Sequence, residues 1–99
     1  MVRLKWTKQA INDLKGISNY ISKDSQRYAN KFVQRIYMKV EILIYQPDSG
    51  RMVDELGRKD VRQLLEGNYR IIYRKVNGTH IEILTIHHSA QRLKPLFIS

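Results

Sequence analysis

The sequence predicts an α+β domain in which a helical hairpin packs on one face of a mainly antiparallel β-sheet. Apolar residues recur at helical spacing between residues 7 and 45, a proline follows at position 47, and two turn dipeptides divide residues 61–87 into strand-like segments. With a short apolar segment at residues 2–6, the expected order is βααβββ. The 99 residues, 42% of them hydrophobic, are expected to form a single domain, residues 1–99.

The helical hairpin is predicted over residues 7–45. In its first helix, apolar residues follow at spacings of four, three and four, which places them on one face: Ala10, Leu14, Ile17 and Ile21. Thr7 is the expected N-cap, because its hydroxyl can accept a hydrogen bond from a first-turn N–H. Asp24 or Ser25 begins the second helix, which has these inward positions: Ala29, Phe32, Val33, Ile36, Val40 and Leu43. Pro47 ends it, since proline disfavours helix in the preceding residue.

The second half of the chain is predicted to form a loop and three strands. Residues 46–60 show no period and are expected to be a loop, and the strands follow at residues 61–66, 69–76 and 79–87. Asn77-Gly78 predicts a two-residue type I′ turn, in which both residues need positive φ, and Gly67-Asn68 is a weaker signal of the same kind. The resulting register pairs Tyr73 with Glu82 and Leu64 with Ile71.

This register divides the sheet into two faces. The helical hairpin is expected to cover the more apolar one: Leu64, Tyr69, Ile71, Tyr73, Leu84 and Ile86. The opposite face mixes apolar residues with basic ones: Val61, Gln63, Leu65, Arg70, Ile72, Arg74, Ile81, Ile83, Thr85 and His87. An open face of this kind suits a partner that buries the isoleucines and offers carboxylates to Arg70 and Arg74. The alternative is that residues 89–99 fold back over it.

The chain is strongly basic, with 18 lysines and arginines against 9 acidic residues and a net charge of +9. Such a charge favours nucleic acid, the ribosome or an acidic protein as the partner. Five basic residues recur every four positions and form a basic ridge: Lys23, Arg27, Lys31, Arg35 and Lys39. Like charges at this spacing destabilise a helix slightly, so the ridge either steers a polyanionic partner or is a solvated face.

Several classes of protein are disfavoured by composition. The absence of cysteine excludes disulfides and cysteine-ligated metals, and no apolar run approaches the length of a membrane span. The first residues lack the apolar core of a signal peptide, which favours a cytoplasmic protein. His87 and His88 point to opposite faces of a strand and cannot chelate one metal together. Neither a metal nor a cofactor is expected.

Three stretches accompany the βααβββ order: SGRMVDEL (residues 49–56), VRQLLEGNYRIIYR (residues 61–74) and ILTIHHSAQRL (residues 83–93). Together they resemble the RelE/ParE superfamily of bacterial toxins, the toxic halves of type II toxin–antitoxin pairs. The resemblance covers nearly the whole chain. It implies a cognate antitoxin as partner and one of two activities.

RelE-like members cleave mRNA in the ribosomal A site with basic side chains on the open sheet face. Arg70 matches one of these, but Val61, Gln63 and Leu65 stand at other basic positions of RelE, and no tyrosine follows Tyr73. If the chain were such an endonuclease, it would use these candidates for catalysis: Arg70, Glu55, His87 and His88. Otherwise Glu55 is expected to be an ion-pair partner of Arg51 or Arg58.

ParE-like members inhibit DNA gyrase and have no known catalytic site. Their GR-x-x-x-EL segment matches Gly50, Arg51, Glu55 and Leu56, and their ending resembles HHSAQRL, although Gln91 and Arg92 depart from the usual arginine and aspartate. The favoured interpretation is therefore a ParE-like inhibitor of DNA gyrase, with the ribosome-dependent mRNA endonuclease as the alternative.

Two sets of binding residues follow from this interpretation. The antitoxin is expected on the open sheet face: Arg70, Ile72, Arg74, Ile81 and Ile83. The cellular target is expected to meet the basic ridge and three further residues: Arg51, His88 and Arg92. Whether the chain is an enzyme depends on which of the two activities it has.

Overall fold

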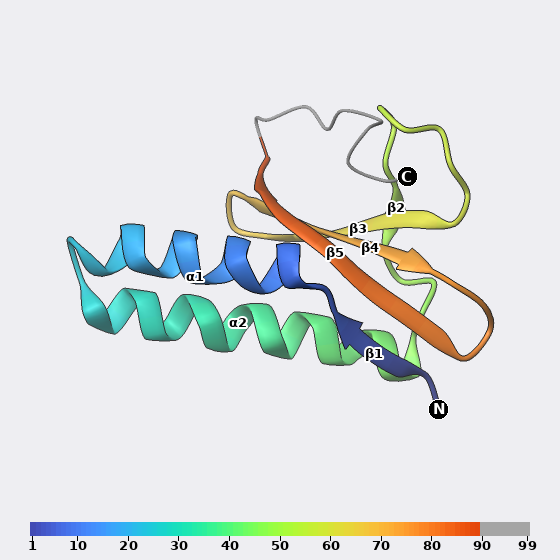
Figure 1. Ribbon diagram of the computed structural model, residues 1–99, viewed down its shortest axis with the longest axis horizontal. Coiled ribbons are helices and arrows are strands. Elements are labelled where there is room, and N and C mark those ends of the chain that lie inside the picture. The colour runs from blue at the N-terminus through green and yellow to red at the C-terminus, as the bar shows by residue number, and fades with distance from the viewer. Residues whose placement is uncertain (90–99) are drawn as a thin grey trace.

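The computed structural model describes residues 1–89, in which seven elements follow one another. They are β1 (Arg3–Trp6), α1 (Lys8–Ser22), α2 (Gln26–Tyr45), β2 (Arg51–Met52), β3 (Val61–Glu66), β4 (Tyr69–Lys75) and β5 (His80–His88). The strands form one sheet in the order β1-β5-β4-β3-β2, with β1 parallel to β5 and the other neighbours antiparallel. The helices lie side by side and pack against the sheet (Figure 1). The predicted fold class is confirmed.

Both helices begin, and α2 ends, where the sequence predicts. The Thr7 hydroxyl accepts a hydrogen bond from the N–H of Ala10 at 3.2 Å, and the Ser25 hydroxyl accepts one from Tyr28 at 3.1 Å. These N-caps satisfy backbone donors that have no partner within the helix. α2 ends at Tyr45, two residues before Pro47. Within residues 1–89, neither helix combines the length and apolar character that a membrane span requires.

The main hydrophobic core lies between the helical hairpin and the sheet. Its buried members come from both helices and from the three long strands: Ala10, Leu14, Ile36, Val40, Leu43, Leu64, Ile71, Tyr73, Ile81, Ile83 and Ile86. Ile81 and Ile83 are therefore core residues, and their predicted place on the open face is wrong.

The β4–β5 register explains this error. The β3–β4 hairpin has the predicted register, with Leu64 opposite Ile71 and positive φ at Gly67. At the other turn neither Asn77 nor Gly78 has positive φ, so the predicted type I′ turn does not form. Instead, the Asn77 side-chain oxygen accepts hydrogen bonds from the backbone N–H groups of residues 79 and 80, at 2.8 and 3.0 Å. The connection is longer, and Tyr73 pairs with residue 83 rather than 82.

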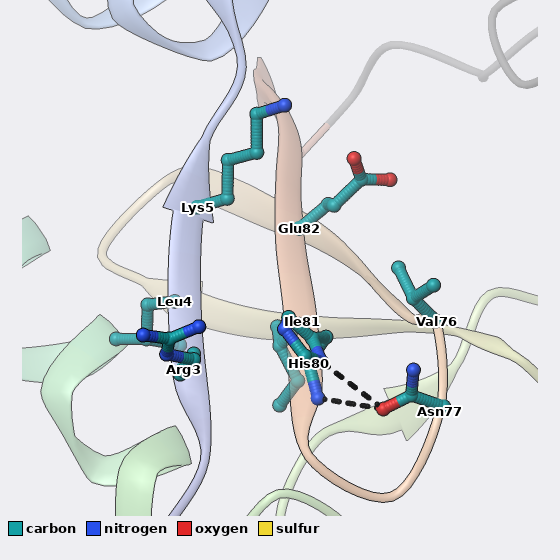
Figure 2. Close-up of a pocket in the computed structure, with 8 residues that line it drawn as sticks. All are labelled: Arg3, Leu4, Lys5, Val76, Asn77, His80, Ile81 and Glu82. Carbon is teal, nitrogen blue, oxygen red and sulfur yellow. Dashed lines mark hydrogen bonds between the residues drawn. The ribbon is translucent and has the colours of Figure 1, made fainter.

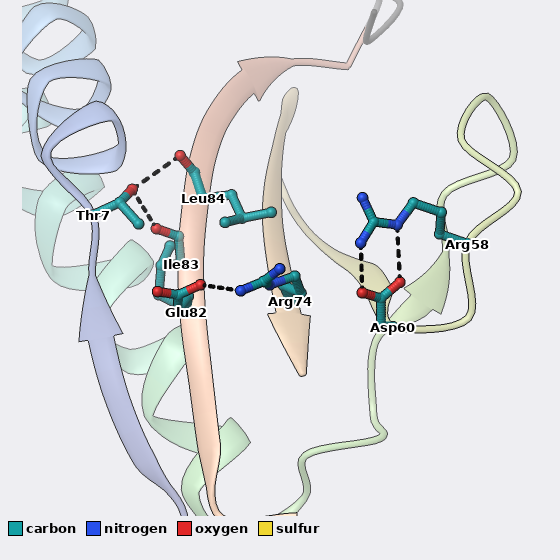
Figure 3. A network of polar contacts seen from close by, with 7 residues as sticks. All are labelled: Thr7, Arg58, Asp60, Arg74, Glu82, Ile83 and Leu84. Atoms are coloured by element: carbon teal, nitrogen blue, oxygen red, sulfur yellow. Dashed lines mark hydrogen bonds and ion pairs between the residues drawn. The ribbon is translucent and has the colours of Figure 1, made fainter. Parts of the chain in front are cut away.

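A β-bulge at Leu84 shifts the register a second time. Tyr73 pairs with Ile83 and Ile72 pairs with Thr85, so Leu84 is the extra residue on β5. Thr7 lies against this bulge, where its hydroxyl approaches the carbonyl oxygens of Ile83 at 2.7 Å and Leu84 at 3.1 Å (Figure 3). The same residue therefore caps α1 and satisfies the carbonyls at the bulge. Leu84 follows the core residue Ile83 and packs on the sheet face away from the helices, so its predicted place on the helix-covered face is wrong.

Candidate functional site

Residues 53–60 pack against part of the outer face of the sheet, meaning the face away from α1 and α2. Val53 is fully buried in this segment and packs against Val61 and Ile72, which are also fully buried, and Leu56 and Leu84 pack around them. This second hydrophobic cluster closes the apolar patch that the sequence analysis expected to be open. Ile72 therefore offers no surface to a partner in this conformation.

Arg70 is the central charged residue of the outer face, and it is only 6% exposed. Its guanidinium donates two hydrogen bonds to the Glu55 carboxylate, at 2.7 and 2.9 Å, and its Nε donates to the Gln63 side chain at 2.6 Å. A paired arrangement of this kind is the strong form of an arginine–carboxylate contact. The pair ties the covering segment to β4. The predicted partner of Glu55 was Arg51 or Arg58, and its pairing with Arg70 was not expected.

The other arginine of the predicted antitoxin surface is also paired. Arg74 donates to Glu82 at 2.9 Å across β4 and β5, and nearby Arg58 binds Asp60 through two hydrogen bonds, at 2.7 and 3.0 Å (Figure 3). The hydrogen bonds from Arg58 lower the pKa of the Asp60 carboxyl. Together with the burial of Ile72, Ile81 and Ile83, this corrects the expectation that the five residues form an open surface.

Tyr73 fixes the chain between α2 and β2. Its buried hydroxyl accepts a hydrogen bond from the N–H of Gly50 and donates one to the carbonyl of Pro47, both at 3.0 Å. Burial raises the pKa of this hydroxyl, so it stays protonated at neutral pH and can fill both roles. Arg62 donates to the Gly50 carbonyl at 2.9 Å. These hydrogen bonds hold residues 47–50 in place just before β2. Arg51, the first residue of β2 and a predicted target contact, is exposed.

The two histidines lie at the end of β5. His87 pairs with Arg70 across β4 and β5, and the exposed His88 pairs with Tyr69, against whose ring its own ring packs at 5.5 Å between centroids. The structure thus brings three candidate catalytic groups to one region: Arg70, Glu55 and His87. Arg70 and Glu55, however, bind each other. Among residues 1–89, no group of three or more acidic or histidine side chains is placed to hold a metal ion.

The basic ridge lies on α2 and its entry. Lys23, Arg27, Lys31 and Arg35 are exposed and Lys39 is half-buried. Three apolar residues near the end of the same helix are also exposed, which was not predicted: Met38, Ile42 and Tyr45. Their spacing of four and three residues was the signal that could have found them. Arg92 lies outside the described residues.

A cavity of about 530 Å³ opens at the β1 edge of the sheet, beside the β4–β5 connection (Figure 2). Its lining includes the charged residues Arg3, Lys5 and Glu82 and the imidazole of His80. The His80 backbone and ring both lie within hydrogen-bond distance of the Asn77 side-chain oxygen. The cavity therefore lies at a basic edge of the sheet, which was not predicted from the sequence.

Comparison with known proteins assigns the family. The sequence model of the ParE toxin of type II toxin–antitoxin systems, parDE, matches residues 4–93. The chain is 35% identical to "Putative toxin Y4kP" of Sinorhizobium fredii (strain NBRC 101917 / NGR234) over 91 residues, which cover 91% of each chain. It is also similar to a solved structure of the chromosomal ParDE TA system from P. aeruginosa, with a TM-score of 0.70 and 33% identity, covering 89% of this chain and 96% of that one. The chain therefore belongs to the ParE toxin family of type II toxin–antitoxin systems.

Proposed function

We propose that the chain inhibits DNA gyrase through protein contacts and that an antitoxin protein neutralises it. Membership of the ParE toxin family supports the first part of this proposal. The second part is supported by the likeness to a chain of a solved ParDE system. Two cellular targets are to be compared, DNA gyrase and mRNA on the ribosome, because the wider RelE/ParE superfamily also contains endonucleases.

The pairing of Arg70 with Glu55 is the observation that favours gyrase over RNA cleavage. Cleavage by general acid–base chemistry needs a base near the attacking hydroxyl and cations near the phosphate. Here the buried guanidinium and the carboxylate bind each other, and Gln63 takes the remaining Nε hydrogen bond. The neighbouring outer-face positions on β3, Val61 and Leu65, add no charge. Among residues 1–89, the side chains around Arg70 on the outer face therefore do not supply the cationic set that a ribonuclease requires.

The alternative, a ribosome-dependent mRNA endonuclease, has one observation in its favour. His87 is the cross-strand neighbour of Arg70, so an imidazole stands beside a guanidinium. This arrangement would be a proton-transfer site only if RNA could displace Glu55 from Arg70. The two activities predict different effects in cells.

We expect cells that express the chain to show a DNA damage response and filamentation while protein synthesis continues. DNA and protein synthesis are measured by labelled precursors after induction, and primer extension maps cuts in translated mRNA. The gyrase proposal predicts no codon-specific cuts. Immediate loss of protein synthesis, with codon-specific cuts that His87→Ala abolishes, would contradict it.

A further inference from the structure

The outer face of the sheet is basic at the corner where β1, β5 and the β4–β5 connection meet. Leu4 packs against the core, so Arg3 and Lys5, on either side of it in β1, lie on the opposite face, where both are exposed. The register sets Arg3 beside His80 of β5. With Asn77 of the connection, these side chains line the cavity of about 530 Å³ (Figure 2). We call the four residues the basic corner: Arg3, Lys5, Asn77 and His80.

The positive charge of the basic corner is not balanced by neighbouring carboxylates. Among the described residues that line the cavity, Glu82 is the one acidic residue, and its carboxylate already binds Arg74 at 2.9 Å. Within residues 1–89, no carboxylate oxygen lies within 4 Å of the charged groups of Arg3 or Lys5. Two cations without acidic partners at the mouth of a cavity favour an anionic ligand.

The polar groups of the basic corner are arranged as hydrogen-bond donors. The Asn77 side-chain oxygen accepts from the N–H groups of residues 79 and 80 and from the Thr79 hydroxyl, at 2.8, 3.0 and 2.9 Å. The connection itself therefore uses the acceptor of the amide, and the NH2 end, a donor, is turned away from His80 (Figure 2). A guanidinium, an ammonium and an amide N–H are the groups that bind phosphate oxygens.

The basic surface continues on the other side of the β4–β5 connection. A second cavity, of about 270 Å³, is lined by Lys59, Asp60, Lys75, Asn77 and Gly78, so Asn77 borders both cavities. The acidic member of this lining, Asp60, binds Arg58 at 2.7 Å. Lys59 is exposed and has no carboxylate oxygen within 4 Å among residues 1–89. Cations without acidic partners thus flank the connection on both sides.

A nucleic acid backbone fits this surface better than a protein does. Protein interfaces have a core from which charged residues are depleted. Here Val76 offers one exposed apolar side chain, whereas Ile81 is only 2% exposed and belongs to the core. A second copy of the chain would add like charge to a molecule whose net charge is already +9. Phosphates satisfy the cations and the amide donor without needing apolar contacts.

We propose that the basic corner, extended by Lys59, binds the phosphate backbone of duplex DNA. Arg3 and Lys5 leave β1 about 6.6 Å apart at ~3.3 Å per residue, so they can meet separate phosphates, which follow one another at about 3.4 Å of helix axis along each DNA strand. The choice of duplex DNA rests on the proposed function, since gyrase holds duplex DNA and would bring the chain to it. Backbone contacts of this kind add to protein contacts with gyrase and carry no sequence preference.

The test measures binding of a fluorescently labelled DNA duplex to the purified chain, without gyrase, between about 50 and 200 mM salt. Arg3→Gln combined with Lys5→Gln should weaken binding on the order of tenfold at the lowest salt. It should also reduce the slope of log affinity against log salt by about 2, one for each lost phosphate contact. The matched control is Lys31→Gln combined with Arg35→Gln, which removes one lysine and one arginine from exposed positions of α2. Its slope should change by less than about 0.5.

Nuclear magnetic resonance of the wild-type chain locates the contact without any substitution. The duplex should shift the amide resonances of residues 3–5 and 76–82 more than those of residues 26–45. This measurement decides the question if the Arg3 and Lys5 double variant does not fold, which circular dichroism shows.

Three results would overturn the proposal. They are equal salt slopes for the two double variants, DNA-induced shifts confined to residues 26–45, and displacement of the duplex by ATP at equal phosphate concentration, which would make the cavity a site for a free nucleotide. None of them touches the proposed function, because inhibition of supercoiling is measured separately with gyrase. DNA binding at the basic corner by a chain that leaves supercoiling unchanged would instead remove the proposed function and keep this site.

Discussion

Glu55→Ala is expected to destabilise the chain by about 3–5 kcal/mol, the usual cost of leaving one member of a buried ion pair without its partner. Arg70 would remain buried beneath residues 53–60 without the carboxylate that accepts two of its hydrogen bonds. A small domain has a total stability of only about 5–15 kcal/mol, so the loss should be plain in a guanidinium unfolding curve. The covering segment should also become more susceptible to proteolysis.

Two comparison variants show whether burial is the cause. Asp54→Ala removes the same charge from the neighbouring, exposed position and should cost less than about 1 kcal/mol. Replacing both partners, as Glu55→Leu with Arg70→Met, should recover most of the lost stability, because no buried charge is then left alone. A cost below about 1 kcal/mol for Glu55→Ala would show that the pair acts as an ordinary surface contact.

Gly50→Ala is expected to cost about 1–3 kcal/mol or more, as overpacking of a filled interior does. A Cβ at this position would lie 2.6 Å from Tyr73 Cε1, 2.8 Å from the Gln63 carbonyl oxygen and closer still to the Tyr73 hydroxyl. Neither the buried ring nor the strand backbone can move away without breaking other contacts. The substitution should also break the hydrogen bond from Gly50 to Tyr73.

Gly16→Ala is the matched control, because it makes the same chemical change in a different environment. Gly16 lies within α1, and an added Cβ would have no neighbour within 4 Å. Alanine is a better helix former than glycine, so this variant should be more stable by about 0.5–1 kcal/mol. Thermal unfolding of both variants gives the comparison. A Gly50→Ala variant as stable as the wild type would contradict the close packing around Tyr73.

The helices and the β3–β4 hairpin could be predicted because their signals are local. Apolar spacing defines α1 and α2, the hydroxyls of Thr7 and Ser25 mark where they begin, and Pro47 marks where α2 must end. Gly67 supplies the positive φ that the two-residue turn requires. Each of these features depends on residues a few positions apart, so it can be predicted from the local sequence pattern.

The errors arose from side-chain contacts within one turn and from contacts between distant residues. The Asn77 hydrogen bonds lengthen the β4–β5 connection, so Ile81 and Ile83 face the core. The Leu84 bulge, bonded to Thr7, which lies 77 positions earlier, then shifts the pairing of residues 85–88. Arg70 binds Glu55 because residues 53–60 fold against the outer face. No periodicity in the sequence indicates that this segment folds there. The segment around Gly50 also contains a short strand, β2, within the predicted loop. The basic ridge was visible in the sequence, but the exposed apolar residues beside it were not singled out.

A supercoiling assay with purified DNA gyrase tests the proposed function most directly. Relaxed plasmid, gyrase and ATP are incubated with the toxin alone and with the toxin bound to its antitoxin. The proposed function predicts that the toxin alone stops supercoiling or traps cleaved DNA, and that the complex does neither. Complete supercoiling at excess folded toxin, together with cleavage of mRNA on translating ribosomes by the same preparation, would contradict it.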